Sequence, residues 1–187
     1  MLATALHYSH TLLTEIVQPG NHVIDATMGN GHDTELLAQL VGKTGKVYAF
    51  DIQPSALENT KKRLSDSGLH ERVALILDGH ENLGNYLDTT EEIHAAVFNL
   101  GYLPKSDKSI ITLPQTTKQA LDTLLTHLAR RGRIIIVAYY GHEGGIAELQ
   151  TVRDYCQQLP QENYNVLNYQ FINQKNQPPI LFCIERK

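Results

Sequence analysis

The stretch HVIDATMGNGHDT, residues 22–34, joins a short apolar run to two closely spaced glycines and a polar segment. The apolar run predicts a buried strand over residues 22–26. Gly29 and Gly31 allow a tight turn and a close backbone approach to a ligand. A helix that starts just after the second glycine directs its free backbone N–H groups toward the same point. The stretch therefore predicts a strand, a glycine turn and a helix, as in Rossmann-like folds.

Six further strand patterns follow and alternate with helical patterns. Several are continuous apolar runs, such as VYAF and IIIVA, which suit strands buried on both faces of a parallel sheet. The expected strands cover residues 46–51, 72–77, 94–99, 133–138, 166–172 and 180–185. Apolar side chains at helical spacing lie between them. The four helical stripes are Leu2, Leu6, Leu13, Ile16 and Val17; Leu36, Leu37, Leu40 and Val41; Ala120, Leu121, Leu124, Leu125 and Leu128; and Ile146, Leu149, Val152, Cys156 and Leu159.

The last two strands are joined only by NQKNQPP, residues 173–179, which leaves no room for a helix. Strands joined without a crossover helix pair antiparallel, so these two should form a hairpin. A mostly parallel sheet with such a hairpin is typical of class I methyltransferases. We therefore expect an α/β, Rossmann-like fold with seven strands, an antiparallel C-terminal hairpin and helices on both faces. We expect it to form one domain over residues 1–187.

The composition is that of an ordinary globular domain, and no apolar run is long enough to span a bilayer. The first 17 residues contain no Lys or Arg, so they fit poorly as a signal peptide. Cys156 and Cys183 are isolated, so we expect reduced structural thiols, a cytoplasmic location and no membrane partner. The net charge of −4 disfavours broad nucleic-acid binding but leaves room for a local basic patch.

An acidic residue, Asp25, ends the first strand, and Thr34 occupies the third glycine position of a dinucleotide fingerprint. This pattern favours the methyltransferase loop, in which the glycine turn packs against the methionine part of the cofactor and the carboxylate orients the turn. A Gly-x-Gly turn is weak evidence by itself, because turns use it widely. The candidate cofactor residues in this segment are Asp25, Thr27, Gly29, Asn30, Gly31, His32, Asp33 and Thr34.

The next two strands also end in carboxylates. Asp51 lies 20 residues beyond the second glycine, where it can accept hydrogen bonds from both ribose hydroxyls, with Ile52 over the adenine. Asp78 is placed to bind the adenine amino group, and Gly79 leaves room for the ring. A helix N-cap and a simple turn are the respective alternatives. The candidates are Asp51, Ile52, Gln53, Asp78, Gly79 and His80. Together with the glycine turn they indicate S-adenosylmethionine, with a nicotinamide dinucleotide as the alternative.

The fourth strand ends in NLGYLP, residues 99–104, which resembles the Asn-Pro-Pro-Tyr motif of methyltransferases that modify exocyclic amines of nucleobases. The Asn99 side-chain oxygen and the Leu100 carbonyl can accept hydrogen bonds from an amine and aim its lone pair at a methyl carbon. Tyr102 can stack on a base. Gly101 replaces a proline of that motif, and an ordinary strand end with a buried tyrosine is the alternative. Asn99, Leu100 and Tyr102 are therefore candidate catalytic residues, and Asn99 is also a candidate cofactor contact.

Substrate contacts are expected on both sides of the fifth strand. Lys105 and Lys108 can contact a backbone phosphate near the target. Tyr140 and His142 lie in the polar segment YYGHEGG, although an ordinary loop histidine is equally compatible with the pattern. No second ligand stands at a typical spacing from any histidine near the expected cofactor site, so we predict no metal.

The motifs DATMGNGHDT, VYAFDIQ, DGH, NLGYLPKSDKSIIT and YYGHEGG occur in this order. Together they resemble the YtqB-like family once labelled putative rRNA methylase and now known as MnmM, over nearly the whole chain. The resemblance implies transfer of a methyl group from S-adenosylmethionine to the aminomethyl nitrogen of 5-aminomethyl-2-thiouridine at tRNA position 34. The product would be 5-methylaminomethyl-2-thiouridine. The resemblance also implies a tRNA anticodon stem-loop as partner and a homodimer.

Two other functions remain open at this stage. The first is a methyltransferase that acts on rRNA or on a small amine, which the same cofactor motifs allow. The second is a nicotinamide-dependent oxidoreductase or a non-catalytic nucleotide-binding module, against which Thr34 and the terminal hairpin argue. The lack of an obvious catalytic cysteine argues against C5 methylation of a pyrimidine through covalent attack.

Overall fold

Seven strands form one sheet in the order β3-β2-β1-β4-β5-β7-β6. The computed structural model describes residues 1–101 and 111–187. The strands are β1 His22–Asp25, β2 Lys46–Asp51, β3 Val73–Leu77, β4 Ile93–Leu100, β5 Leu128–Ala138, β6 Tyr164–Tyr169 and β7 Ile180–Arg186. The first five strands pair in parallel, whereas β7 is antiparallel to both β5 and β6. The predicted sheet and its C-terminal hairpin are confirmed.

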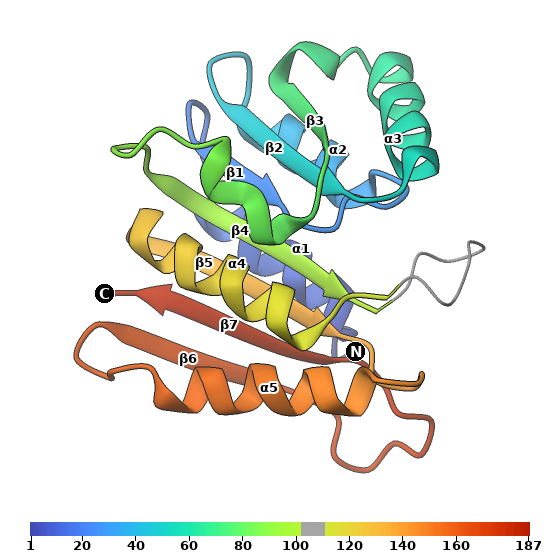
Figure 1. Cartoon of the computed structure of the whole chain (residues 1–187), viewed down its shortest axis with the longest axis vertical. Coiled ribbons are helices and arrows are strands. Elements are labelled where there is room, and N and C mark those ends of the chain that lie inside the picture. The colour runs from blue at the N-terminus through green and yellow to red at the C-terminus, as the bar shows by residue number, and fades with distance from the viewer. Residues whose placement is uncertain (102–110) are drawn as a thin grey trace.

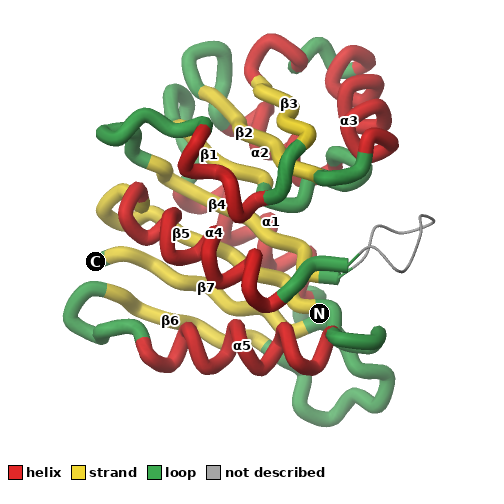
Figure 2. The backbone as a smooth tube through the Cα atoms, in the orientation of Figure 1, coloured by secondary structure: helices red, strands yellow, loops and turns green. Residues whose placement is uncertain are grey.

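Helices cover both faces of the sheet (Figures 1 and 2). In Figure 1, α1 and α2 lie behind the sheet, and α4 and α5 lie in front of it. The α-helices are α1 Ala5–Ile16, α2 His32–Leu40, α3 Pro54–Asp66, α4 Pro114–His127 and α5 Gly145–Gln158. Short 3₁₀ helices cover His70–Arg72 and His80–Asn85. Within the described residues, no helix has the length and apolarity needed to cross a membrane.

Local sequence explains where several helices begin. Thr4 caps α1, because its hydroxyl oxygen accepts a hydrogen bond from the backbone N–H of His7 at 3.2 Å. Pro54 and Pro114 stand in the first turns of α3 and α4, where a proline has the right φ and its missing N–H costs nothing. Gly31 precedes α2 in the left-handed region.

Two apolar clusters fill the space between the sheet and its helices. Successive side chains of a strand point to opposite faces, so Ile24 packs with the α4 and α5 side, and its neighbour Val23 packs with the α1 and α2 side. In β4, Phe98 and Val97 divide in the same way. Burial on both faces explains why the central strands are continuous apolar runs.

Some predicted boundaries and core positions differ from the structure. Leu2 and Leu6 are exposed, because α1 faces the sheet with Leu12 and Leu13 instead. Ile146, at the start of α5, is also exposed. Leu128 ends the expected helical stripe, but its extended backbone pairs with Ile93 and begins β5.

The order of the strands determines where a ligand can bind. The chain moves outward from β1 to β2 and β3, and then returns to place β4 on the other side of β1. The connections that follow β1 and β4 therefore diverge, which leaves a crevice at the carboxyl ends of these two strands.

Candidate active site

A cavity of about 990 Å³ lies at these carboxyl ends. Its size is within the range of pockets that enclose a small ligand, roughly 300–1,000 Å³. We call its two parts the β1–β3 side and the β4–β5 side. The β1–β3 side is lined by residues 26–30, 32–33, 51–53 and 78–81. The β4–β5 side is lined by residues 6, 10, 99, 101, 111–113, 116, 139–142 and 177.

The glycine turn has the geometry that the sequence predicts. Gly29 and Gly31 have φ values of 50° and 78°, which L-residues with side chains seldom adopt. A Cβ atom at Gly31 would lie 2.8 Å from the Thr60 side chain, so the turn is also too close to α3 for a larger residue. The Met28 N–H donates to the Phe50 carbonyl at 2.9 Å and ties the turn to β2.

Asp25 supports this turn from behind the cavity. It is fully buried, and its carboxylate accepts the Thr27 N–H at 3.2 Å and the Thr34 hydroxyl at 2.6 Å. Burial and the nearby Asp33 charge raise the pKa of Asp25 to about 7. Asp25, Gly31 and Thr34 do not line the cavity, in contrast to the other cofactor candidates from the turn.

Asp51 faces the cavity from the end of β2. One carboxylate oxygen accepts the Gly29 N–H at 3.0 Å, and the other accepts the Gln53 N–H at 2.9 Å. Burial raises the pKa of this carboxyl despite these bonds. Each carboxylate oxygen has further lone pairs, so both can accept a hydroxyl from a ligand. Ile52 is exposed to the cavity beside it.

Asp78 is occupied by several local donors. Its carboxylate accepts the Gly79 N–H and the Asn82 side-chain amide, each at 2.8 Å, and the Tyr86 hydroxyl at 2.9 Å. The Asn82 and Tyr86 bonds hold the pKa of Asp78 below its usual range. His80, the next cofactor candidate, donates from Nδ1 to the Ala26 carbonyl at 3.0 Å, and burial lowers its pKa.

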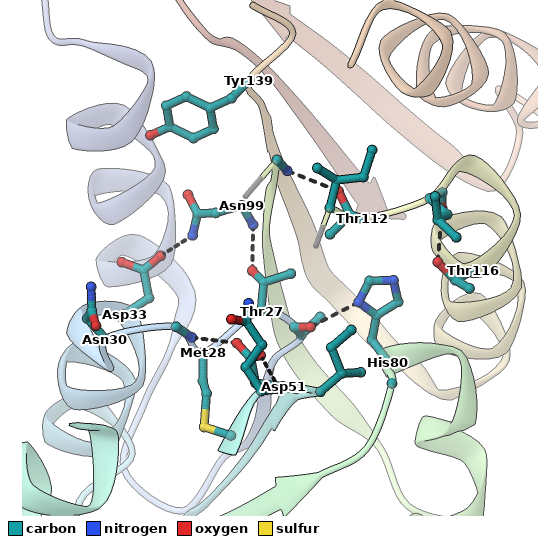
Figure 3. A pocket seen from close by; sticks show the side chains of 18 of the residues that line it. Thr27, Met28, Asn30, Asp33, Asp51, His80, Asn99, Thr112, Thr116 and Tyr139 are labelled. Atoms are coloured by element: carbon teal, nitrogen blue, oxygen red, sulfur yellow. Dashed lines mark hydrogen bonds between the residues drawn. The ribbon is translucent and has the colours of Figure 1, made fainter. Parts of the chain in front are cut away.

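Asn99 stands where the two sides of the cavity meet (Figure 3). Its backbone N–H donates to the Thr27 hydroxyl oxygen at 2.8 Å, and its side-chain Nδ2 donates to Asp33 at 2.6 Å. Its Oδ1 is buried, and no donor among the described residues reaches it. This oxygen is therefore available to a hydrogen-bond donor of a ligand. In contrast, the Leu100 carbonyl accepts the Tyr139 N–H at 2.9 Å.

Gly101, directly after β4, and Thr112 are hydrogen-bonded to each other. The Thr112 N–H donates to the Gly101 carbonyl, and the Gly101 N–H donates to the Thr112 hydroxyl oxygen, each at 3.0 Å. Thr112 and Thr117 then donate their hydroxyls to the buried Glu148 carboxylate of α5, at 2.6 and 2.8 Å. Three of the predicted residues, Tyr102, Lys105 and Lys108, lie outside the described residues.

The two remaining substrate candidates, Tyr140 and His142, both line the cavity. Sequence reasoning did not single out Leu6, His10, Tyr139 or Gln177, which line it as well. Leu6 and His10 lie one helical turn apart on α1, and His10 interrupts the apolar stripe of that helix. That interruption is the signal that could have identified this face. No cluster of three His, Cys, Asp or Glu side chains able to hold a metal occurs in residues 1–101 and 111–187.

Comparisons with known proteins identify the family of this chain. The family described as "Putative rRNA methylase" matches residues 47–185. The chain belongs to this family. A chloroplastic tRNA (mnm(5)s(2)U34)-methyltransferase of Arabidopsis thaliana is 36% identical over 98% of this chain and 70% of its own length. Crystal structures of family proteins provide a second comparison.

A putative rRNA methylase from Clostridium thermocellum has a TM-score of 0.97 and 45% identity, with full coverage of both chains. A putative methyltransferase from Streptococcus mutans in complex with SAH has a TM-score of 0.91 and 40% identity, also with full coverage. As a member of the rRNA methylase family, the chain is a methyltransferase that uses S-adenosylmethionine. The nicotinamide alternative is therefore wrong.

The residues of the β1–β3 side fit this cofactor. The left-handed glycine turn leaves its backbone open to a ligand, and Asp51 has lone pairs for the ribose hydroxyls. Ile52 provides an exposed apolar surface for the adenine. The buried oxygen of Asn99 lies at the junction of the two sides of the cavity.

Proposed function

We propose that this chain methylates the aminomethyl nitrogen of 5-aminomethyl-2-thiouridine at the wobble position of tRNA. The product is 5-methylaminomethyl-2-thiouridine, and S-adenosylhomocysteine is released. The observation that carries the proposal is the buried Asn99 oxygen, which accepts hydrogen bonds and therefore suits an amine. The Arabidopsis relative, whose name specifies this tRNA nucleoside, supports the same substrate.

The protein's contribution is mainly to bind and orient. Bound S-adenosylmethionine supplies a methyl group on a positively charged sulfur. Asp51 and the glycine turn hold that cofactor, while the Asn99 oxygen accepts an N–H of the neutral amine and directs its lone pair toward the cofactor. A primary amine is a good nucleophile once neutral, so orientation provides most of the rate enhancement. The nitrogen gains a methyl group and releases one proton to solvent.

The β4–β5 side offers surfaces for a nucleobase. Leu6 and Tyr139 supply apolar and aromatic surface, and Tyr140 and His142 add polar groups. A wobble base lies in a single-stranded loop, so it can turn into a pocket at modest cost. We extend the proposal to Tyr102 as a stacking residue and to Lys105 and Lys108 as phosphate contacts. It also includes an anticodon stem-loop partner, a homodimer and a cytoplasmic location.

Nucleoside mass spectrometry tests the proposal. tRNA that carries 5-aminomethyl-2-thiouridine is incubated with the protein and S-adenosylmethionine, then digested and analysed. We expect the aminomethyl nucleoside to gain the mass of one methylene unit. If it does not gain this mass while S-adenosylhomocysteine still binds, the substrate assignment is wrong.

The second candidate is a methyltransferase acting on rRNA or on a small amine. The family description and the net charge of −4 favour this alternative. Competition between the modified tRNA, rRNA and small amines in one methyl-transfer assay separates the two. The tRNA proposal requires the stem-loop to suppress methylation of the other acceptors. Suppression of tRNA methylation by rRNA or by a small amine would favour the alternative.

A further inference from the structure

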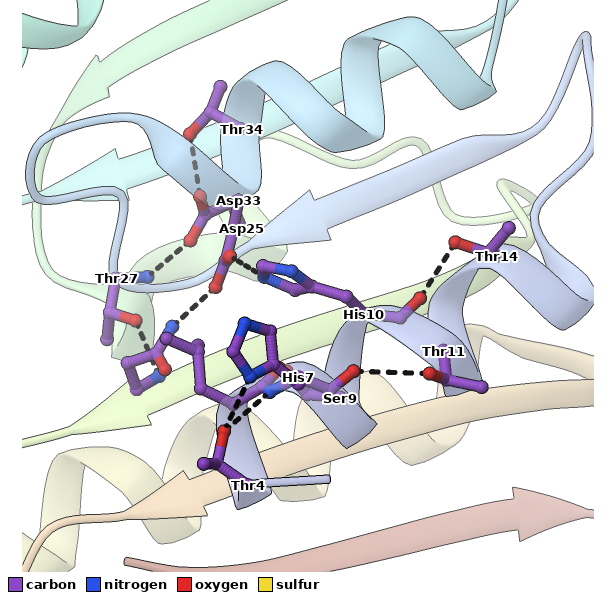
Figure 4. Close-up of polar contacts among 12 residues, drawn as sticks. Thr4, His7, Ser9, His10, Thr11, Thr14, Asp25, Thr27, Asp33 and Thr34 are labelled. Atoms are coloured by element: carbon purple, nitrogen blue, oxygen red, sulfur yellow. Dashed lines mark hydrogen bonds and ion pairs between the residues drawn. The ribbon is translucent and has the colours of Figure 1, made fainter. Parts of the chain in front are cut away.

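Three side chains from three different elements are joined by hydrogen bonds in series beside the cavity (Figures 3 and 4). His10 of α1 bonds through Nε2 to Asp33 Oδ1 at 2.6 Å. The other oxygen of Asp33, at the start of α2, accepts Nδ2 of Asn99 at 2.6 Å. All three residues line the cavity, so this series of hydrogen bonds extends from the surface helix α1 to the residue that faces the amine.

The chemistry of Asp33 determines which way the Asn99 amide points. An ionised carboxylate accepts hydrogen bonds but donates none. The NH₂ group of Asn99 must therefore face Asp33, which leaves its oxygen for the ligand. Oxygen and nitrogen of an amide have nearly the same shape, so packing alone discriminates poorly between the two orientations. The orientation then depends on Asp33 keeping both its charge and its position.

Among the described residues, His10 is the other side chain, besides Asn99, that is hydrogen-bonded to Asp33. The Asp33 side chain is only 7% exposed, so little water solvates its charge. A short hydrogen bond from His10 Nε2 compensates for this loss and fixes the carboxylate against rotation. His10 itself is 33% exposed and also borders a small surface pocket with Thr11, Thr14 and Glu15. It therefore joins the buried pair to solvent.

We propose that His10 is a positioning residue that acts through Asp33 to hold the Asn99 oxygen toward the cavity. The site then selects a methyl acceptor whose N–H can donate a hydrogen bond to this oxygen. The assignment of the reacting group to an amine rests on the proposed function. The orientation of the Asn99 amide does not, because it follows from the bonds of Asp33 to His10 and to Asn99. A nucleophile that presents only lone pairs cannot donate a hydrogen bond to the Asn99 oxygen.

The charged groups around His10 define its expected titration. Asp33 is its direct partner from α2, Asp25 lies behind Asp33, Glu15 lies near it on α1, and Tyr139 faces the same region. The bond to Asp33 raises the pKa of His10 although burial opposes the shift. As the pH falls through that raised value, His10 gains a charge and its bond to Asp33 becomes an ion pair.

Variants of His10 test the positioning role. His10→Leu keeps bulk but removes the donor, whereas His10→Gln retains an N–H near the position of Nε2. With a stem-loop that carries the aminomethyl uridine, we expect His10→Leu to lower kcat about tenfold, as for loss of a hydrogen bond to a charged group. KM and the Kd of S-adenosylhomocysteine should change by less than about twofold. His10→Gln should restore kcat to within about threefold of the wild type.

His7→Leu is the matched control, because His7 is an exposed histidine on the same helix, and its side chain bonds only to Thr4 among the described residues. It should leave kcat unchanged. Unchanged kcat in His10→Leu would overturn the proposal. So would an equal loss of kcat and cofactor affinity that His10→Gln fails to restore, since that result indicates a general structural role.

A measurement without substrate keeps this proposal separate from the proposed function. The side-chain amide resonance of Asn99, assigned by its loss in Asn99→Ala, is followed by NMR as the pH changes. In the wild type its shift should follow the titration of His10, and in His10→Gln that inflection should disappear. An Asn99 signal that ignores pH in both proteins would overturn the proposal, even if the tRNA is methylated. Failure to methylate the tRNA, with the inflection present, would overturn only the substrate.

Discussion

The two sides of the cavity differ in how their polar groups are held. On the β1–β3 side, backbone N–H groups of the strand-end turns support Asp51, which faces the cavity. On the β4–β5 side, Asn99 depends on Asp33 and, through it, on His10 of α1. The first arrangement is built into the sheet and its glycine turn. The second depends on how separate helices pack, so the two sides should respond differently to substitution.

Asn99→Ala should have the largest effect and should separate the two sides. It removes the oxygen that we propose orients the amine, so we expect kcat to fall roughly 100- to 1,000-fold. The Kd of S-adenosylhomocysteine should stay within about threefold, because Asp51 and the turn remain. Steady-state kinetics and calorimetry measure the two quantities. Asn165→Ala, at an exposed site of β6, is the control, and full activity in Asn99→Ala would refute the orienting role.

Asp51→Ala should produce the opposite result. It removes two acceptors for the ribose and the bond that fixes the Gly29 N–H. We expect the Kd of S-adenosylhomocysteine to rise about 30- to 100-fold, equivalent to the loss of two hydrogen bonds of about 1.0–1.4 kcal/mol each. Calorimetry provides the measurement. Asp66→Ala, at the exposed end of α3, should bind normally. Unaltered affinity in Asp51→Ala would place the ribose elsewhere.

Glu148→Gln should weaken the β4–β5 side without affecting cofactor binding. The Glu148 side chain is 2% exposed and accepts both the Thr112 and Thr117 hydroxyls. A glutamine amide accepts through one oxygen only, so we expect a loss of about 1–2 kcal/mol of stability. Chemical denaturation measures that loss, and turnover should fall because Thr112 anchors Gly101.

Glu162→Gln, at an exposed position, is the control for Glu148→Gln. Unfolding midpoints that are the same in both variants would show that the Glu148 contacts contribute nothing to stability. A selective loss of S-adenosylhomocysteine affinity in Glu148→Gln would show that the two sides of the cavity are coupled.

Cofactor affinity should depend on pH through Asp51. Burial raises the pKa of its carboxyl, so it takes up a proton at a higher pH than an ordinary aspartate. The protonated form accepts fewer hydrogen bonds, so the affinity should fall as the pH is lowered. Between pH 7.5 and pH 5 we expect the affinity for S-adenosylhomocysteine to weaken. Calorimetry across this range tests it, and Asp51→Asn should remove the part of the dependence that Asp51 contributes, while Asp25, with a pKa of about 7, still titrates. An affinity that rises at low pH would contradict this assignment.

The thiols should show the smallest effect. Burial raises the pKa of Cys156 and of Cys183 to about 12, so both stay protonated at neutral pH. Iodoacetamide should therefore leave the native protein unmodified and fully active, while the unfolded protein reacts at both positions. Intact-protein mass spectrometry distinguishes these outcomes. Rapid alkylation of the native chain, accompanied by loss of turnover, would contradict this prediction and would show that a thiol contributes to activity.

The order of elements was predictable because the strand signals are local. Continuous apolar runs predict buried parallel strands, and the short link between β6 and β7 permits only a hairpin. The β1–β3 side was predictable for a related reason. Carboxyl ends of parallel strands meet at one edge, so a glycine turn and Asp51 must converge there once the sheet exists. Asn99 followed from the same rule.

Only the tertiary structure brought His10 to Asp33 and Glu148 to Thr112. The apolar stripe of α1 predicts one buried face, but its rotation on the sheet buries Leu12 and Leu13 and turns Leu6 and His10 toward the cavity. Apolar side chains at helical spacing predict which residues share a face, whereas the contacts of that face depend on packing against elements distant in sequence. The sequence by itself thus determined the fold and the β1–β3 side of the cavity, and packing decided how the Asn99 amide is held.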